Sequence, residues 1–166
     1  MRIEGRARVF GDGINTDYII SSARKRVTLD PDELKRWLFE TVDPGFAASI
    51  QEDDILVAGE AFGSGSAMEV AVTAVRAAGI RAVVAKSFSR TYFRNAINNG
   101  LLPVECATSG VSEGDLLRIE VDHARALVVN TTTGLRYEAP PFADFVYGVL
   151  EAGGLVDYLR DRGRLV

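Results

Sequence analysis

The chain has 166 residues, of which 47% are hydrophobic and 25% are charged, and its formal net charge is −4. This length suits one domain over residues 1–166, and the composition is that of a globular protein rather than a disordered or fibrous one. The slightly acidic balance gives no general attraction to nucleic acid or to an anionic membrane, so we expect neither as a partner.

Cysteine content and hydrophobic pattern exclude further classes. Cys106 is the chain's one cysteine, so we expect no internal disulfide and no iron–sulfur cluster held by this chain, since such a cluster needs several thiolates. We expect no other metal on it either, and Cys106 should behave as a small buried hydrophobe. Residues 1–6 lack the apolar run of a signal peptide, and no stretch is long enough to span a membrane, which favours a cytoplasmic protein.

The first part of the chain predicts one strand, a polar loop and the start of a helix. Residues 3–10 alternate and predict a strand that ends in the turn-forming residues 11–15. Residues 21–28 are polar and contain the basic run 24–26, which is either solvated or folds over a cleft to hold carboxylates. A helix is expected to follow Asp30, a residue type that caps helix N-termini.

The middle of the chain predicts alternating strands and helices. Residues 54–58 and 81–86 are short apolar runs that predict buried strands. A glycine-rich turn over residues 59–65 leads into a predicted helix over residues 66–78, and a second helix is expected over residues 89–98. This order favours an α/β layered core with right-handed crossovers.

The last part of the chain changes pattern. Residues 116–121 and 126–129 predict two short strands joined by a hairpin-like connection. Residues 144–152 and 155–162 then predict two helices.

The glycine-rich turn before residue 66 allows three interpretations. Ser66 and Glu69 have the spacing of a capping box, which needs no further function. A serine at a helix N-terminus beside glycine amides also suits the binding of an anionic substrate. A dinucleotide site is the third, but Lys86 stands where an acidic ribose ligand is expected, and we reject it.

Two further polar stretches have structural and functional interpretations. Asn15 and Asp17 lie in a turn, where their side chains are expected to bond the local backbone. Arg90, Arg94 and Asn98 recur on one face of the helix predicted over residues 89–98. That face is either solvated or part of an interface.

Three stretches in this order resemble a known family: residues 11–20, 55–66 and 85–100. The chain is similar over essentially its whole length, including residues 157–159, to the small subunits of 3-isopropylmalate dehydratase and homoaconitase. These are equivalent to the C-terminal domain of aconitase. The resemblance implies an α/β fold, a single swivelling β/β/α domain.

The resemblance also implies an activity and a partner. The family removes water from a malate-type 2-hydroxy acid, and often adds it back at the neighbouring carbon. 3-Isopropylmalate or a related alkyl-substituted malate is the expected substrate. The implied partner is a large subunit bearing a [4Fe–4S] cluster, in a heterodimer or heterotetramer, with one iron acting as a Lewis acid.

The resemblance assigns roles to single residues. Ser66 matches the serine that acts as the base in the family's glycine-rich motif, and Glu69 matches the glutamate that supports the helix start. Asp17 matches the aspartate of the Thr-Asp motif that faces the active site. Gly65 is expected to border the substrate, and Arg24 aligns with the arginine of the loop that selects it.

The motif after Ser66 departs from the family pattern, which has Ser-Arg where this chain has Ala67 and Met68. Both residues are expected to border the substrate. The missing arginine normally makes a charge-assisted contact to a substrate carboxylate, worth about 1.5–3 kcal/mol. Three interpretations remain open: a less charged or bulkier substrate group, replacement of the lost charge by Arg24 or Arg26, or a binding or regulatory module without activity.

Overall fold

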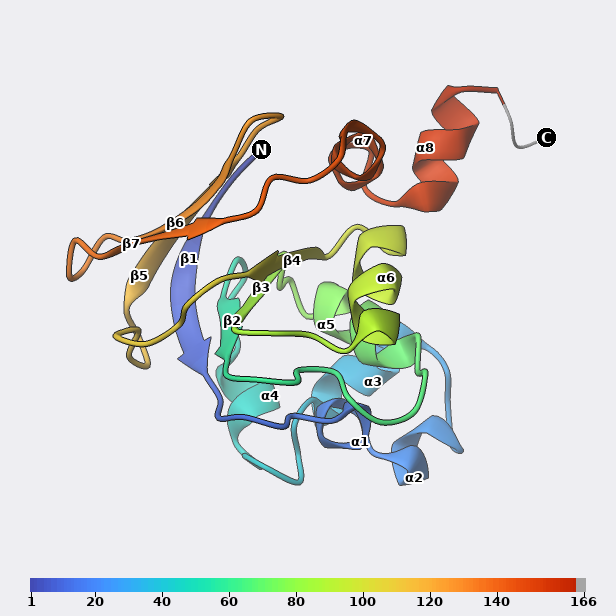
Figure 1. The fold of residues 1–166 in the computed structure, drawn as a ribbon. Helices are drawn as coiled ribbons and strands as arrows, with labels where there is room; N and C mark the ends of the chain where they lie inside the picture. The colour runs from blue at the N-terminus through green and yellow to red at the C-terminus, as the bar shows by residue number, and fades with distance from the viewer. Residues whose placement is uncertain (164–166) are drawn as a thin grey trace.

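The structure, a computed structural model, describes residues 1–163 and is centred on a seven-stranded sheet with the order β4-β3-β2-β1-β5-β6-β7 (Figure 1). β1 to β4 run parallel to one another, whereas β5 to β7 are antiparallel. The strands are β1 (Arg2–Val9), β2 (Ile55–Ala58), β3 (Ala82–Ala85), β4 (Leu102–Glu105), β5 (Leu116–Val121), β6 (Ala126–Asn130) and β7 (Arg136–Ala139).

Short helical turns fill the long connection between β1 and β2, and longer helices follow β2, β3 and β7. The short turns are α1 (Thr16–Ile19), α2 (Ser22–Lys25), α3 (Pro31–Leu34), the 3-10 turn η1 (Lys35–Trp37) and α4 (Phe46–Ser49). The longer helices are α5 (Val70–Ala77), α6 (Arg90–Asn98), α7 (Asp144–Glu151) and α8 (Leu155–Asp161). In Figure 1, α7 and α8 lie apart from α1 to α4.

Both faces of the parallel strands are covered, which explains their uninterrupted apolar sequences. Every residue of β2 and β3 is buried, as is typical of parallel strands between two layers. Leu56 and Val83 belong to one core, built with α3, α4 and α5, and Ile55 and Val84 belong to a second core with β5, β6 and α7. The predicted α/β layering is confirmed.

The two edge strands were not predicted from the sequence pattern, and neither were the short helical turns α1, α2 and α4. β4 contains Pro103 at its second position, a residue that cannot donate to a ladder and is tolerated at a sheet edge. β7 forms the opposite edge. The predicted helix after Asp30 is confirmed, because the Asp30 carboxylate accepts from the backbone N–H of Asp32 and Pro31 occupies the first turn.

Two further points concern the lengths of the helices and the extent of the domain. None of its helices is both long and apolar enough to cross a membrane. The domain predicted over residues 1–166 includes residues 164–166, which lie outside the described residues, so its full extent stays a prediction.

Candidate active site

Three loops meet at one edge of the sheet, because parallel strands bring their carboxyl ends to the same side. Residues 10–15 follow β1, residues 59–69 follow β2 and residues 86–89 follow β3. Isolated bridges join the first loop to the second and the second to the third. The sequence motifs that lie far apart in the chain are therefore neighbours in space.

The loop after β1 supports the glycine-rich loop through backbone hydrogen bonds. The N–H of Gly63 donates to the carbonyl of Ile14 at 2.7 Å, and the N–H of Thr16 donates to the carbonyl of Ser64 at 2.9 Å. The Thr16 hydroxyl donates to the carbonyl of Ser66 at 2.9 Å. These bonds fix the backbone of Ser66 and leave its side chain free of them.

The loop after β3 supports the glycine-rich loop from the other side. The N–H of Phe62 donates to the carbonyl of Ser87 at 3.0 Å, and the Ser87 hydroxyl accepts from the N–H of Ala61 at 2.9 Å. Ala61 has φ +57°, a left-handed conformation that these bonds maintain. The Ser89 hydroxyl donates to the carbonyl of Gly63 at 2.6 Å, which joins α6 to the loop.

Ser66 is exposed at the centre of this arrangement. Gly65 before it has φ +92°, and Gly65 and Ala67 are exposed as well. Within residues 1–163, the Ser66 hydroxyl takes part in none of the hydrogen bonds found. The structure thus presents an unengaged hydroxyl on a braced loop.

The predicted capping box is wrong. α5 begins at Val70, so Ser66 lies before the helix rather than at its N-cap, and the Glu69 side chain makes no capping hydrogen bond. The chain between them turns inward to bury Met68, and this burial determines the path of the backbone instead of the capping pair. The field of a helix terminus falls off within the first turn, so α5 gives Ser66 little of it.

The Met68 side chain is buried, whereas a contact with substrate requires an exposed side chain. Its side chain is 3% exposed and packs in the same core as Ala71 and Val72 of α5. The contact predicted between Met68 and a substrate is therefore not open to this side chain in this structure. Compared with the arginine of the family motif, Met68 lacks a positive charge and contributes an apolar side chain to the core.

Asp17 lies on α1, directly after Thr16, whose hydroxyl donates to the carbonyl of Ser66. The Asn15 side chain caps α1 by accepting from the N–H of Tyr18 at 3.0 Å. The Asp17 carboxylate is exposed and accepts from both the N–H and the hydroxyl of Ser22. The expected bonding of Asn15 and Asp17 to the local backbone is confirmed, and Asp17 joins α1 to α2.

Arg24 is engaged by protein groups. Its guanidinium contacts the Glu40 carboxylate, with 2.8 Å between Nη2 and Oε2, and lies 4.6 Å from the centre of the Trp37 ring. The hydrogen bonds from Arg24 hold the pKa of Glu40 below its usual range. Arg26, at the end of α2, is exposed.

The face of α6 that carries Arg90, Arg94 and Asn98 is exposed, as the helical spacing indicates. Tyr92 and Ala96 on the opposite face are buried. Contact with solvent explains the polar residues of this face in the isolated chain. An interface with a partner at this face stays a prediction.

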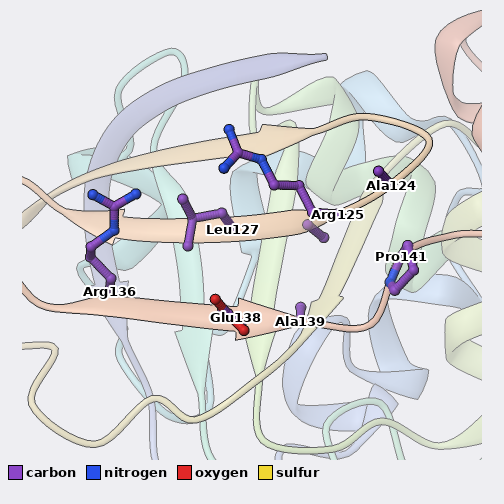
Figure 2. A pocket seen from close by; sticks show the side chains of 8 residues that line it. Ala124, Arg125, Leu127, Arg136, Glu138, Ala139 and Pro141 are labelled. Carbon is purple, nitrogen blue, oxygen red and sulfur yellow. The ribbon is translucent and has the colours of Figure 1, made fainter.

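A hollow of about 490 Å³ lies away from this edge, on β6 and β7. Figure 2 shows Arg136 toward one end of it, Ala124 and Pro141 toward the other, and Arg125 and Glu138 between them. It contains none of the predicted site residues. Ser66 instead lies on an open surface, where a small substrate would need further walls from another polypeptide.

The residues of this chain do not fit an iron–sulfur cluster. In the part of the chain that the structure describes, no group of three or more His, Cys, Asp or Glu side chains is placed to hold a metal ion. Cys106 is buried, as predicted, and burial raises the pKa of its thiol to about 11, which disfavours the thiolate that a metal requires.

Comparison with known proteins gives consistent matches over the whole chain. The aconitase C-terminal domain family matches residues 25–109. The 3-isopropylmalate dehydratase small subunit of Caldanaerobacter subterraneus subsp. tengcongensis is 42% identical, over 98% of this chain and 100% of that one. The methanogen homoaconitase small subunit of Methanocaldococcus jannaschii is 42% identical, over 98% and 94%. A crystal structure of 3-isopropylmalate dehydratase from M. jannaschii superposes with a TM-score of 0.91 at 41% identity, over 98% and 96%.

Proposed function

Because the chain belongs to the aconitase C-terminal domain family, we propose that it is the small subunit of a two-subunit hydro-lyase. Membership confirms the predicted aconitase-type swivelling fold. The substrate class is a malate-type 2-hydroxy acid. We place 3-isopropylmalate first, because several similar chains are named for its dehydratase, and a related alkyl-substituted malate second. A regulatory module without activity is not favoured by these relatives.

The partner in this proposal is a large subunit that carries the [4Fe–4S] cluster, in a heterodimer or heterotetramer. Two features support this assignment: similar chains are named small subunits, and Cys106 is the one cysteine of this chain, whereas a cluster needs several thiolates. We place the complex in the cytoplasm. The metal chemistry is the partner's, and this chain contributes a base and groups that position the substrate.

Ser66 carries the proposal. Its hydroxyl is exposed and makes no hydrogen bond to the described residues, and its loop is held by the loops after β1 and β3. In the proposed reaction, the Ser66 side chain acts as its alkoxide and takes the proton from the carbon next to a substrate carboxylate. The electron pair of that C–H bond forms a double bond to the neighbouring carbon, whose C–O bond breaks. The departing hydroxyl group takes up one proton and leaves as water, so the net change is the loss of H2O. A positioned general base contributes about 10²- to 10⁴-fold to such a step.

The charge that favours this proton transfer comes from outside α5, since Ser66 lies beyond the first turn of the helix. Arg26 is exposed at the end of α2 and is a candidate for binding one substrate carboxylate. Gly65 and Ala67 are exposed on either side of Ser66 and leave room for the substrate backbone. Asp17 supports the site by holding α2 against α1.

Replacement of Ser66 in the co-expressed complex tests the assignment. Ser66→Ala should lower kcat by at least about 100-fold with little change in complex formation. Ser64→Ala is the matched control, because it removes the same hydroxyl two residues away and leaves the backbone bonds of the loop intact. Activity of Ser66→Ala near that of Ser64→Ala would end the base assignment.

A panel of hydroxy acids tests the substrate. The reconstituted complex should turn over 3-isopropylmalate or 2,3-dimethylmalate faster than a tricarboxylic acid. The reason is that Met68 is uncharged and buried, so it cannot bind the additional carboxylate of a tricarboxylic acid as the arginine of the family motif would. Faster turnover of homocitrate than of either alkyl malate would contradict this choice.

A further inference from the structure

Arg24, Trp37 and Glu40 form a compact group, here called the arginine clasp. Arg24 Nε lies 3.0 Å from Glu40 Oε1, and Arg24 Nη2 lies 2.8 Å from Glu40 Oε2. The Trp37 ring covers one face of the guanidinium, with its centre 4.6 Å from Cζ. The Ser21 hydroxyl donates to Glu40 Oε1 at 3.1 Å. Two charge-assisted bonds and a stacked ring fix both the position and the orientation of Arg24.

The backbone before Glu40 is held in a conformation that aims the carboxylate at Arg24. Phe39 has φ +57°, which a bulky residue adopts only where its surroundings force it. Phe39 is fully buried, its ring is stacked 4.3 Å from that of Phe10, and its N–H donates to the carbonyl of Ile19 at 3.0 Å. The core therefore supports the clasp.

A continuous set of contacts joins the clasp to Ser66. Thr16 of α1 bonds the carbonyl of Ser66, and Asp17 next to it accepts from Ser22 of α2. α2 carries Arg24, so the clasp fixes the far end of a segment whose near end touches the glycine-rich loop. Loss of the clasp would free residues 21–29 while leaving the sheet intact.

We propose that Arg24 is a positioning residue: the arginine clasp fixes residues 21–29 beside the candidate site, and its guanidinium is not the group that binds a substrate carboxylate. The Nε–Nη2 edge of Arg24, which suits two-bond recognition of a carboxylate, is already occupied by Glu40. The kinetic part of this inference rests on the proposed function. The structural part does not.

The chain itself provides a probe of the clasp, because Trp37 is its one tryptophan. Intrinsic tryptophan fluorescence and acrylamide quenching of the isolated full chain report on the environment of this ring alone. Trypsin cleaves after basic residues, so cleavage after Lys25 and Arg26 reports on the opening of the segment. Neither measurement needs substrate or partner.

Glu40→Gln removes the charge and keeps the shape of the side chain. It should raise the rate of cleavage after Lys25 and Arg26 by about tenfold and increase quenching of Trp37. Arg36→Ala is the matched control, because it removes an exposed guanidinium next to Trp37 and leaves the clasp intact. Equal cleavage and quenching in Glu40→Gln and the native chain would overturn the proposal. Glu40→Asp, which keeps the charge, serves if Glu40→Gln does not fold, and should give a smaller change of the same sign.

Kinetics of the complex separate positioning from direct binding, because the two roles predict opposite results. Under positioning, Glu40→Gln and Arg24→Lys both raise KM for the hydroxy acid by about tenfold, with kcat changed by less than about threefold. Under direct binding, Glu40→Gln releases Arg24 for the substrate and leaves KM unchanged or lower, which would overturn the proposal. A complex that turns over no hydroxy acid contradicts the proposed function, while the cleavage and fluorescence results still decide the clasp.

Discussion

Gly63 packs directly against the ring of Tyr92: a Cβ atom at residue 63 would lie 2.2 Å from Tyr92 Cγ. Gly63 also has φ +73°, a conformation that residues with side chains rarely adopt. The Ser89 hydroxyl, which caps α6, donates to the carbonyl of Gly63. The close approach therefore joins the glycine-rich loop to α6, and only glycine allows it.

Gly63→Ala should destabilise the chain through two separate costs. The left-handed conformation costs a residue with a Cβ about 1–2 kcal/mol, and the contact with Tyr92 adds about 1–3 kcal/mol of overpacking. Gly13→Ala is the matched control, since Gly13 has φ +69° but no atom within 4 Å of its Cβ position, and should show the first cost alone. Urea unfolding measures both. Equal losses in the two variants would contradict the steric role of Tyr92.

Asp54 is buried beneath two arginines. It is 1% exposed, and its Oδ2 lies 2.9 Å from Arg6 Nη2 and 3.2 Å from Arg8 Nη1. Burial alone raises the pKa of Asp54, but hydrogen bonds from Arg6, the N–H of Gln51 and Arg8 outweigh it and lower the pKa below its usual value. The carboxylate is thus held charged in the folded state.

Stability should therefore fall in acid in a way that depends on Asp54. Asp54 has a lower pKa in the folded chain than in the unfolded chain, where it is about 3.9. The stabilisation that this difference provides is complete at pH values above the unfolded pKa, and it is lost as the pH falls through the folded pKa. Asp54→Asn should remove this acid dependence and cost about 3–5 kcal/mol near neutral pH, because it breaks a buried pair. Asp53→Asn is the control, expected within about 0.5 kcal/mol of the native chain, because the Asp53 side chain is half-exposed and its ion pair with Arg81 lies at the surface. An unchanged acid slope in Asp54→Asn would refute the assignment, with urea unfolding at several pH values as the measurement.

Cys106 should be nearly inert in the folded chain. It is 8% exposed, and burial raises the pKa of its thiol to about 11. At about pH 8 roughly one thiol in a thousand is then ionised, so alkylation by iodoacetamide should be slow and should rise about tenfold per pH unit. The urea-unfolded chain is the control and should react at the rate of a free thiol. A folded chain that reacts as fast as the unfolded one would show that Cys106 is accessible.

Met68→Arg restores the arginine of the family motif, but at residue 68 the side chain is buried in the core and not exposed at the candidate site. The side chain would enter the core without an ionic partner, and the chain should lose several kcal/mol of stability. Met68→Leu keeps the volume and should cost less than about 1.5 kcal/mol. Thermal unfolding and the KM of the complex measure the effects. Native-like stability together with a lower KM in Met68→Arg would show that residues 66–69 can turn outward.

Local signals in the sequence were sufficient for most of the framework. The apolar runs predicted β2 and β3, and Asp30 marked the start of α3, because capping involves only residues within one turn. A helix over residues 89–98 was predicted as well, and its cap, Ser89, was identified only in the structure. The glycine-rich motif also located the loop that holds Ser66. The family resemblance rested on the same stretches, and the comparisons bear it out.

Tertiary contacts decided the details of the site. α5 begins at Val70 instead of residue 66 because the core takes in Met68, and burying a large apolar side chain outweighs a capping pair. Arg24 meets Glu40, 16 residues away, only because Phe39 and the core around it bend the intervening chain. Spacing along a chain describes neighbours within a turn, whereas which charges meet and which side chains are buried depends on how separate segments pack.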